Sequence, residues 1–449
     1  MGTLYIDTGG ATTNSGSRDA NSAALSGAAA TVVGSVVTLD GSPDLSSVQT
    51  SGATQDTIHL NDATNSNQKI FWITAVDDVA KTVTVSVAPT GVVSSAWAIG
   101  GRHVLTNASI EAAPRAGDTV QFNNSPAAQA ATVWTSRNAG DSTSGYNKII
   151  GKSGTRPLLN TTGNNVVATL GSNYNWIENL ELDTDGASGI CISGAGAAMI
   201  AFNLKCSDAG GSAISITGSG AKVIGCEVNG GAGADGIALT TGVSYIGNYV
   251  HDVVGDGGEA AANNPQILLL NNIFDTCAGR GIYWSGAPTA AGGNDLRIIG
   301  NTVYGCGNSG LEIADADGTV LLINNIFSEN GNAAGEYNIE WAAGAAEYVS
   351  FHAWNVFYHS GGGGGANLSG LTVNAQVASS EFTTDPAFTD AAGGNFSIGT
   401  TSPAKATGFP GAFLGGSTGY LDIGAVQRQE AGGSAGLIVA PQTNFVIGG

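Results

Sequence analysis

The chain has 449 residues, of which 69 are Gly and only 11% are charged. Gly at this density, without a G-X-Y period, is typical of tight turns between short strands, so we expect an all-β protein rather than collagen or long helices. Thirty-five acidic residues against fifteen basic ones give a net charge of -20, which argues against nucleic acid and membrane surfaces as partners.

Residues 1 to about 105 carry no repeated phrase and look like a separate β domain. The runs ATVVGSVVTLDGS, DTIHLND, QKIFWITAVDD and KTVTVSVAPTG are strand-like and are bounded by Gly, Asn, Asp and Pro. Four or five such strands suffice for a small sandwich or barrel. The opening run TLYIDT could belong to this domain or form the first strand of the body that follows.

Targeting signals are also informative. The N-terminus has no basic region followed by an apolar run, so we expect no signal peptide and synthesis in the cytoplasm. No segment approaches 18 uncharged apolar residues, so we expect no membrane insertion. Five Cys without paired CxxC spacing argue against a disulfide scaffold or a zinc site and favour a reducing compartment.

From about Arg115 strands occur at coil-like spacing, and between Trp176 and Phe357 one phrase returns repeatedly. It reads VIGCEV, YIGNYV, LLNNIF, IIGNTV, LINNIF and HAWNVF, with Cys226, Asn248, Asn272, Asn301, Asn325 and Asn355 in fourth place and looser copies around Asn179 and Asn203. Steps of 22 to 30 residues with one apolar strand indicate a solenoid, here a parallel β-helix. We expect the Asn side chains to stack and to hydrogen-bond from coil to coil.

A second phrase supplies another strand in each coil and reads GICI, AISI, GIAL, GIYW, GLEI and NIEW. Alternation with period 2 places its Ile and Leu residues, beginning with Ile190 and Ile192, in the core. The residues between them form an outward row of Cys191, Ser215, Ala238, Tyr283, Glu312 and Glu340. One coil lacks the phrase, and its run GDGGEAAANN predicts a protruding loop. Cys277 and Cys306, each five residues after a repeat Asn, should stack as small buried hydrophobes.

The repeat decays after GGGGGANLSG. We therefore expect an N-terminal β domain for capping or attachment (1–105), a parallel β-helix (106–375), a C-terminal cap (376–430), and a linker with a strand-like tail (431–449). The tail contains GLIVAP and NFVIGG, two apolar runs that a strand added to a partner's sheet would bury.

The Asp-Pro-x-Phe segment, the SPA and the closing DIGA resemble the C-terminal end of right-handed parallel β-helix proteins of the pectate-lyase-like superfold. With the Asn phrases, this resemblance covers residues 115 to 428. TLDGSPDLSSV and QKIFWITAVDD in the N-terminal domain are similar to segments of tailed-phage proteins. The resemblance implies a structural or host-contacting virion protein, such as a tail spike, fibre or capsid decoration, that is made in the host cytoplasm.

Such a protein would work as a homo-oligomer, by analogy with phage spikes a trimer, and would contact other virion proteins through its N-terminal domain or tail. Host surface polysaccharide is the expected ligand, and no cofactor is expected. Because the superfold hosts many functions, two alternatives stay open. One is a polysaccharide lyase or glycoside hydrolase, and the other is a bacterial surface adhesin.

Acidic and aromatic residues on neighbouring coils suggest a glycan-binding patch. Three residues after the repeat Asn, His251, Asp275 and Tyr304 should point outward, and with Tyr283, Glu312 and Glu340 they would suit a sugar chain. The alternative is that all six are ordinary solvated residues.

Catalytic and metal candidates are fewer. The run HDVVGDGGEAAANN carries His251, Asp256 and Glu259, with Arg280 about one coil further on, and paired carboxylates are what glycosidases require. Any acidic solenoid offers such pairs by chance, so we favour a binding role over catalysis. Two Asp-x-Asp-Gly motifs could bind calcium or could be Asx turns, and they contain Asp183, Asp185, Asp315 and Asp317.

Overall fold

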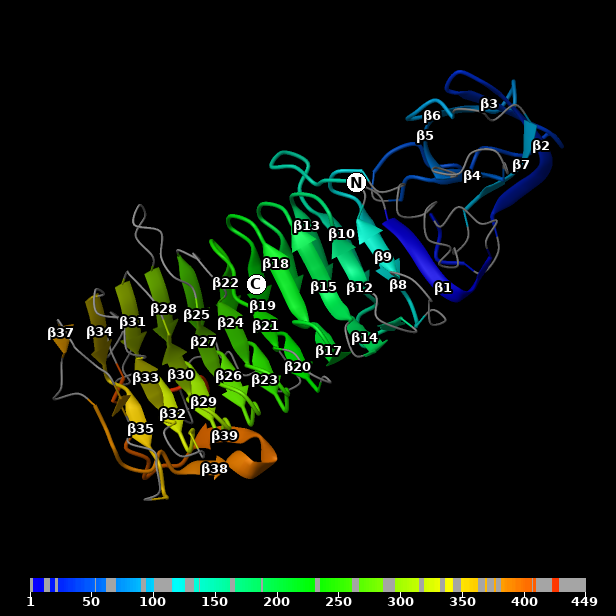
Figure 1. Cartoon of the computed structure of the whole chain (residues 1–449). Helices are drawn as coiled ribbons and strands as arrows, with labels where there is room; N and C mark the ends of the chain where they lie inside the picture. Colours follow the sequence, from blue (N-terminus) through cyan, green and yellow to red (C-terminus); the bar gives the residue numbers. More distant parts are fainter. Residues whose placement is uncertain are drawn as a thin grey trace. The chain divides into compact units, whose positions relative to one another are not determined.

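The computed structural model is an all-β protein (Figure 1). It describes residues 3–11, 17–20, 23–52, 54–61, 70–89, 94–100, 115–125, 133–136, 138–161, 166–186, 189–230, 235–260, 266–285, 295–314, 319–331, 336–341, 349–361, 368–369, 375–376, 381–405, 407–408 and 422–427. The chain forms two compact units. Unit 1 comprises residues 1–162, 166–183 and 194–200, and unit 2 comprises residues 163–165, 184–193 and 201–449. Within the described residues, no helix is long and apolar enough to cross a membrane.

Unit 1 contains a closed antiparallel barrel with strand order β2-β3-β6-β5-β4-β7. Its strands are β2 (Leu25–Val33), β3 (Val36–Leu39), β4 (Thr57–Asn61), β5 (Ile70–Asp77), β6 (Thr82–Val85) and β7 (Ser94–Ile99). Ile58, Phe71 and Trp97 are among the side chains that fill it. Closure pairs every strand on both sides, so the barrel has no exposed sheet edge.

The remaining strands of unit 1 form its first coils. β1 (Thr3–Ala11), β8 (Thr119–Phe122), β10 (Asn147–Gly151), β13 (Asn175–Glu178) and β16 (Ile200–Phe202) make one sheet. β9 (Trp134–Ser136) pairs with β12 (Val166–Leu170), and β11 (Leu158–Asn160) with β14 (Glu181–Gly186). The opening strand β1 runs parallel to β8, with Thr3 opposite Thr119, so it belongs to the coils and not to the barrel.

Unit 2 contains three parallel sheets, which confirms the predicted parallel β-helix. The first sheet holds β19 (Lys222–Ile224), β22 (Ser244–Ile246), β25 (Ile267–Leu270), β28 (Asp295–Ile299), β31 (Thr319–Ile323), β34 (Val349–Ala353) and β37 (Ala375–Gln376). The second sheet holds β17 (Lys205–Ala209), β20 (Glu227–Asn229), β23 (Tyr249–His251), β26 (Ile273–Asp275), β29 (Thr302–Tyr304), β32 (Ile326–Ser328) and β35 (Val356–Tyr358). The third sheet holds β15 (Ile190–Ala195), β18 (Ile214–Thr217), β21 (Ile237–Ala238), β24 (Gly258–Ala260), β27 (Ile282–Trp284), β30 (Leu311–Ile313), β33 (Ile339–Trp341) and β36 (Leu368–Ser369).

A sharp corner joins each strand of the first sheet to one of the second. The residue at this corner has a positive φ of 54° to 66° in Gly225, Gly247, Asn271, Gly300, Asn324 and Trp354. Gly and Asn tolerate this left-handed region best, which explains why the phrase reads GC, GN or NN in most coils. Asn179 and Asn203 have the same positive φ and precede the buried Leu180 and Leu204. They are therefore corner residues and not looser copies of the repeat Asn.

The repeat Asn follows the corner, is fully buried and forms a continuous ladder, as the sequence predicts. From Asn272 onward, each side-chain oxygen accepts from the backbone N–H and the side-chain amide of the preceding Asn, at 2.8 to 3.0 Å for Asn272 and Asn301. Each amide also donates to a first-sheet carbonyl, as Asn272 does to Tyr245 at 2.9 Å. Buried amides are thus satisfied without water.

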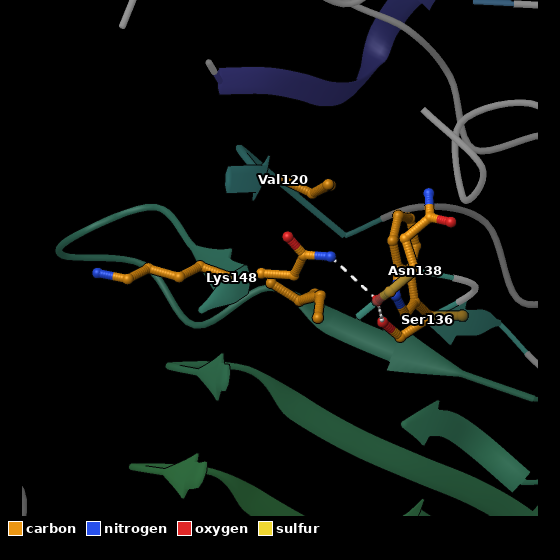
Figure 2. Close-up of a pocket in the computed structure, with 7 residues that line it drawn as sticks. Val120, Ser136, Asn138 and Lys148 are labelled. Carbon is orange, nitrogen blue, oxygen red and sulfur yellow. Dashed lines mark hydrogen bonds between the residues drawn. The ribbon is translucent and has the colours of Figure 1, made fainter. Parts of the chain in front are cut away.

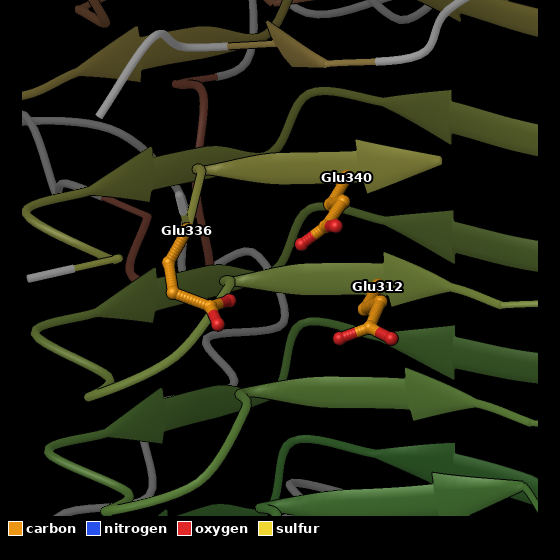
Figure 3. A group of neighbouring side chains, drawn as sticks. All are labelled: Glu312, Glu336 and Glu340. Carbon is orange, nitrogen blue, oxygen red and sulfur yellow. The ribbon is translucent and has the colours of Figure 1, made fainter. Parts of the chain in front are cut away.

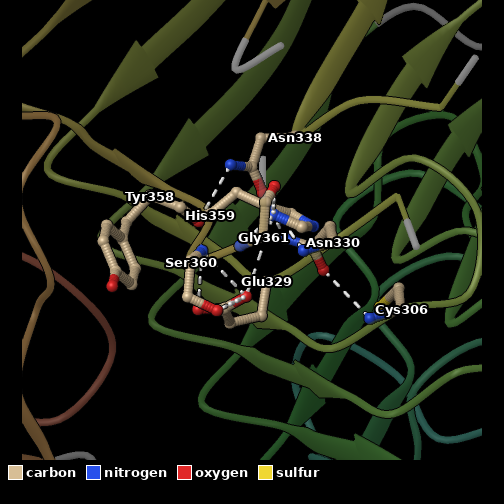
Figure 4. A network of polar contacts seen from close by, with 8 residues as sticks. All are labelled: Cys306, Glu329, Asn330, Asn338, Tyr358, His359, Ser360 and Gly361. Atoms are coloured by element: carbon tan, nitrogen blue, oxygen red, sulfur yellow. Dashed lines mark hydrogen bonds and ion pairs between the residues drawn. The ribbon is translucent and has the colours of Figure 1, made fainter. Parts of the chain in front are cut away.

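A second, shorter ladder lies five residues further along each coil. Cys277 and Cys306 are buried there as predicted, and the hydrogen bond with Cys306, together with burial, raises the pKa of the Cys277 thiol. In the next coil Asn330 accepts from the Cys306 N–H at 3.1 Å and donates to Asn338 Oδ1 at 2.9 Å (Figure 4). Asn338 in turn donates to the Tyr358 carbonyl at 3.1 Å.

The alternation of the second phrase is confirmed in β18, β21, β27, β30 and β33, whose Ile and Leu side chains are buried. It is wrong in β15. There Cys191 is fully buried, with its Sγ 3.5 Å from the Ser207 carbonyl, whereas Ile190 is partly exposed. The small thiol fits inside and finds an acceptor there, so Cys191 does not join the outward row.

A hairpin closes part of the second sheet. β38 (Phe388–Asp390), the 3-10 turn η2 (Ala391–Gly393) and β39 (Asn395–Ile398) place Phe396 against Ile273 and Ala425. Gly424 N–H donates to the Asn324 carbonyl at 2.8 Å. The SPA and DIGA segments therefore pack along the flank of the second sheet. The predicted strand-like tail, 431–449, lies outside the described residues.

Candidate functional site

The outer face of the third sheet carries a row of side chains, most of which are acidic or aromatic. Successive register pairs join Ala238 to Glu259, Glu259 to Tyr283, Tyr283 to Glu312, and Glu312 to Glu340. We call these five residues the third-sheet row. Glu259 enters it because Gly258–Ala260 is the strand β24, so the predicted protruding loop is wrong for these residues. The repeat persists there with Gly-Glu-Ala in place of an aliphatic phrase.

A second column lines the turn that enters each strand of the third sheet. Backbone N–H groups of Gly236, Gly257, Gly281 and Gly310 donate to the carbonyls of Asp256, Arg280, Ser309 and Tyr337, at 2.8 to 3.2 Å. Asp235, Asp256, Arg280, Ser309 and Tyr337 therefore stack, and we call them the entry column. A Cβ on Gly236 would meet the Gly257 carbonyl at 2.6 Å, so Gly is required for this close approach.

Arg280 ties the two columns together. Its Nε is bound to the Glu312 carboxylate, its Nη1 lies 3.6 Å from Asp256 Oδ2, and its backbone N–H donates to Asp256 Oδ1 at 2.6 Å. Its guanidinium carbon also lies 3.9 Å from the centroid of the Tyr283 ring. Arg280 thus neutralises part of the acidic surface and orients both Glu312 and Tyr283.

Glu259 is the most perturbed carboxyl group of this face. Burial, a hydrogen bond with Asp235 and the negative charges of Asp235 and Asp256 raise its pKa to about 7. Asp235 in turn accepts from the Asp256 backbone N–H at 2.9 Å, which holds it in place. Burial is the largest cause that raises the pKa of Asp256 as well. Glu259 can therefore carry a proton at neutral pH and release it readily.

Glu312 meets two further carboxylates at the far end of the row (Figure 3). One oxygen each of Glu312, Glu336 and Glu340 lies within 4.8 Å of the others. The Ser309 hydroxyl lies 2.9 Å from Glu336 and 2.8 Å from Glu340. Oxygen ligands of this kind suit a hard cation such as Ca²⁺ or Mg²⁺, and these residues are the ones that could hold it.

Comparison with known proteins identifies the handedness of the coils. A family described as "Right handed beta helix region" matches residues 177–345. The coils therefore form a right-handed parallel β-helix.

Two solved structures resemble the β-helix. It shares 15% identity with the Dettilon tailspike protein over 60% of this chain and 58% of that chain, with a TM-score of 0.43. It shares 11% identity with pectate lyase Pel9A over 73% of this chain and 92% of that chain, with a TM-score of 0.49. Thus the chain spans little more than half of the tailspike's length. A search of the curated proteins gives no match.

The second sheet of the β-helix carries the other predicted row. His251, Asp275 and Tyr304 are neighbours in register, as the sequence predicts. They do not share a face with Tyr283, Glu312 and Glu340, so the single predicted patch is wrong. Tyr304 makes edge contacts with Phe388 and Phe396, with ring centroids 5.9 and 5.5 Å apart, because the hairpin β38–β39 packs on this face.

His251 and Asp275 are engaged locally. His251 stacks on Tyr249 at 4.3 Å and binds Asp252 Oδ2 through Nδ1 at 2.8 Å. The Tyr249 hydroxyl donates to Asp275 Oδ2 at 2.9 Å, and burial raises the Asp275 pKa to about 6. Of the predicted catalytic residues, the β-helix therefore brings Asp256, Glu259 and Arg280 together and places His251 on another sheet.

The predicted calcium-binding residues lie partly outside the described residues. Asp183 lies in the strand β14, not in a turn, while the side chain of Asp185 and both Asp315 and Asp317 lie outside the described residues.

A small cavity is lined by Val120, Trp134, Ser136, Asn138, Asn147, Lys148 and Ile149 (Figure 2). Its space of about 10 Å³ is close to the volume that one water requires, so it cannot hold a sugar.

Asp235, Ser309 and Glu336 are the site residues that the sequence analysis missed. For Asp235 and Ser309 a signal exists. Asp235, Arg280 and Ser309 each directly precede the Gly of a GI or GL phrase. Aligning that position across the coils would have exposed the entry column. Glu336 has no such periodic signal, since it reaches the site from a turn.

Proposed function

We propose that the chain is a glycan-binding β-helix that cleaves glycosidic bonds on the outer face of its third sheet. The observation that carries this proposal is Glu259, an outward carboxyl group with a pKa of about 7 beside an aromatic ring and a second, ion-paired carboxylate. Glu259 is the general acid that protonates the leaving oxygen. Glu312, held by Arg280, is the base that activates water.

The separation of the two carboxyl groups favours inversion. Glu259 and Glu312 stand two strands apart with Tyr283 between them, and strands are about 4.8 Å apart, so their backbones are separated by about 10 Å. Inverting glycosidases keep their carboxyl groups about 6.5 to 9.5 Å apart, which leaves room for a water molecule. Flexible Glu side chains can close the small difference.

Tyr283 supplies the floor of this site. An aromatic ring between acid and base can cover the apolar face of one sugar ring, while the flanking carboxylates accept hydrogen bonds from its hydroxyl groups. Arg280 lies on the Tyr283 ring and holds its orientation. Thus Tyr283 positions the sugar, while its neighbours in the third-sheet row, Glu259 and Glu312, act as acid and base.

Incubation with a panel of neutral and acidic polysaccharides tests the proposal. Wild-type protein should release reducing sugar with inverted anomeric configuration by NMR, and Glu259→Gln should lose a factor of about 10²–10⁴ in kcat while still binding glycan. Glu329→Gln, which changes a carboxylate directly after the second-sheet strand β32, is the matched control and should keep full activity. Unsaturated products would indicate a lyase instead, and an unchanged Glu259→Gln variant would remove the acid assignment.

The virion setting is part of the same proposal. A glycan-cleaving or glycan-binding β-helix suits a tail spike or fibre that contacts host polysaccharide, works as a trimer and attaches through its N-terminal barrel or its tail. Deletion of residues 431–449 should leave the melting curve nearly intact and abolish assembly or attachment, as measured by sedimentation and by electron microscopy of particles. Unchanged assembly and attachment would contradict this role of the tail.

A further inference from the structure

Three aromatic side chains gather on unit 1. Tyr146 makes edge contacts with both Tyr174 and Trp176, with ring centroids 5.7 and 5.6 Å apart. All three side chains are half-buried. Lys148 stands opposite Trp176 in register, with its Nζ 5.3 Å from the ring centroid. The cluster therefore sits at the surface, with a polar rim.

Tyr174 occupies an unfavourable backbone conformation. Its φ is 53°, in the left-handed region that bulky residues rarely adopt. The turns that enter β16, β19, β22 and β25 place Ala198, Gly220, Gly242 and Gln266 in the same region, with φ of 54° to 73°. The repeat therefore imposes this conformation at the turn. It fixes the backbone position from which the Tyr174 side chain projects.

The neighbouring turn packs closely against the backbone of Tyr174. A Cβ on Gly140 would meet the Tyr174 carbonyl oxygen at 2.4 Å and its Cβ at 2.8 Å. Gly140 N–H also donates to the Asn173 carbonyl at 3.1 Å. The two turns thus pack backbone against backbone, which fixes the position of Tyr174 in the cluster.

We propose that Tyr146, Tyr174 and Trp176 form a platform that binds a pyranose ring of a glycan chain. Aromatic rings match the C–H face of a sugar, and their polar edges tolerate water. Lys148 is exposed and can donate hydrogen bonds to sugar hydroxyls, while Glu178, two residues after Trp176 on β13, can accept them.

A protein partner fits this surface less well. A protein interface needs a larger apolar area with aliphatic residues at its centre. Among the described residues, the exposed large hydrophobic side chains are Val33, Val36, Val79, Val87 and Val254, none of which belongs to the cluster. The platform goes beyond the proposed hydrolysis and does not depend on it, because binding here requires neither Glu259 nor Glu312.

Calorimetric titration of the full chain with cellohexaose, maltohexaose, chitohexaose and hexagalacturonate tests the platform. At least one of them should bind, and Trp176→Ala should weaken that binding about tenfold, as the loss of one aromatic contact predicts. Trp176→Phe should retain most of it. Tyr174→Gly should weaken binding similarly while its melting temperature stays within about 3 °C of wild type, because the strain is relieved as the contact is lost.

Tyr283→Ala separates this site from the third-sheet row. If Tyr283→Ala abolishes all binding and Trp176→Ala changes none, the platform is overturned while the proposed function stands. If none of the four oligosaccharides binds at millimolar concentration, the platform is likewise overturned. If Tyr174→Gly retains wild-type affinity, the Tyr174 ring takes no part in binding and the platform of three aromatic residues is overturned.

Discussion

Replacing Asn301 by Leu tests whether the Asn ladder stabilises the β-helix. In the native coil, Asn301 Oδ1 accepts from the Asn272 N–H at 2.8 Å and from the Asn272 side-chain amide at 2.9 Å. Its own amide donates to Asn325 Oδ1 at 3.1 Å and to the Leu269 carbonyl at 3.0 Å. Leu has a similar volume but offers none of these contacts.

The expected loss follows from the groups left behind. Two donors of Asn272 become unsatisfied, and each buried unsatisfied group costs about 1–3 kcal/mol. Asn325 Oδ1 keeps the Asn301 backbone N–H at 2.8 Å, so it adds little. We therefore expect Asn301→Leu to lower the free energy of unfolding by about 4 kcal/mol, a large share of the ~5–15 kcal/mol typical of native proteins.

Chemical denaturation followed by circular dichroism measures this loss. Cys226→Asn is the matched control, because Cys226 begins the ladder, its N–H already donates to Asn248 Oδ1 at 2.9 Å, and the Ala201 carbonyl lies 3.8 Å from its Sγ. That variant extends the ladder and should be neutral or stabilise by up to about 1 kcal/mol. A loss below about 1 kcal/mol for Asn301→Leu would refute the reasoning.

Two further predictions concern titrating carboxyl groups. Asp235→Asn removes the charge beside Glu259, so the pKa of Glu259 should fall. The high-pH limb of the kcat/KM profile should then move to lower pH, because the acid loses its proton earlier. If that limb does not move, Glu259 is not the acid. Asp275 has a folded pKa of about 6 against an ordinary 3.8, so the folded chain binds its proton more tightly. Its contribution to stability is therefore complete below about pH 4 and is lost as the pH rises through 6. Asp275→Asn should raise the melting temperature at pH 7 and have no effect at pH 4 by calorimetry, whereas Asp252→Asn, which removes a carboxylate with a lowered pKa, should lower the melting temperature at pH 7.

The repeat was predictable because the same local geometry recurs in each coil. Asn272 and Asn301 recur because a buried corner needs an amide that both donates and accepts. Asn271 and Gly300 precede them because that corner needs a positive φ. These demands act on single positions and therefore leave a period in the sequence. Cys191 broke the alternation because a small thiol with an acceptor fits inside as well as an aliphatic side chain.

The candidate site was only partly predictable. The outward positions of Glu312 and Glu340 follow from alternation within a strand. Glu259 could not be assigned to the same row, because Gly-Glu-Ala by itself does not have the apolar alternation of a strand. Its pairing with the strands on either side makes β24. The proton held by Glu259 depends on Asp235, which stands one coil away and 24 residues earlier.

The amino-acid sequence by itself determined the class, the repeat, the buried Asn ladder and the acidic surface, because these arise from local geometry and from composition. Only the tertiary structure decided that β1 joins the coils, that the hairpin covers Tyr304, and that Arg280 binds Glu312 above Tyr283. Those features depend on contacts between segments far apart in the chain. A periodic sequence specifies how one coil stacks on the next, but it does not specify which outward side chains a cap will cover.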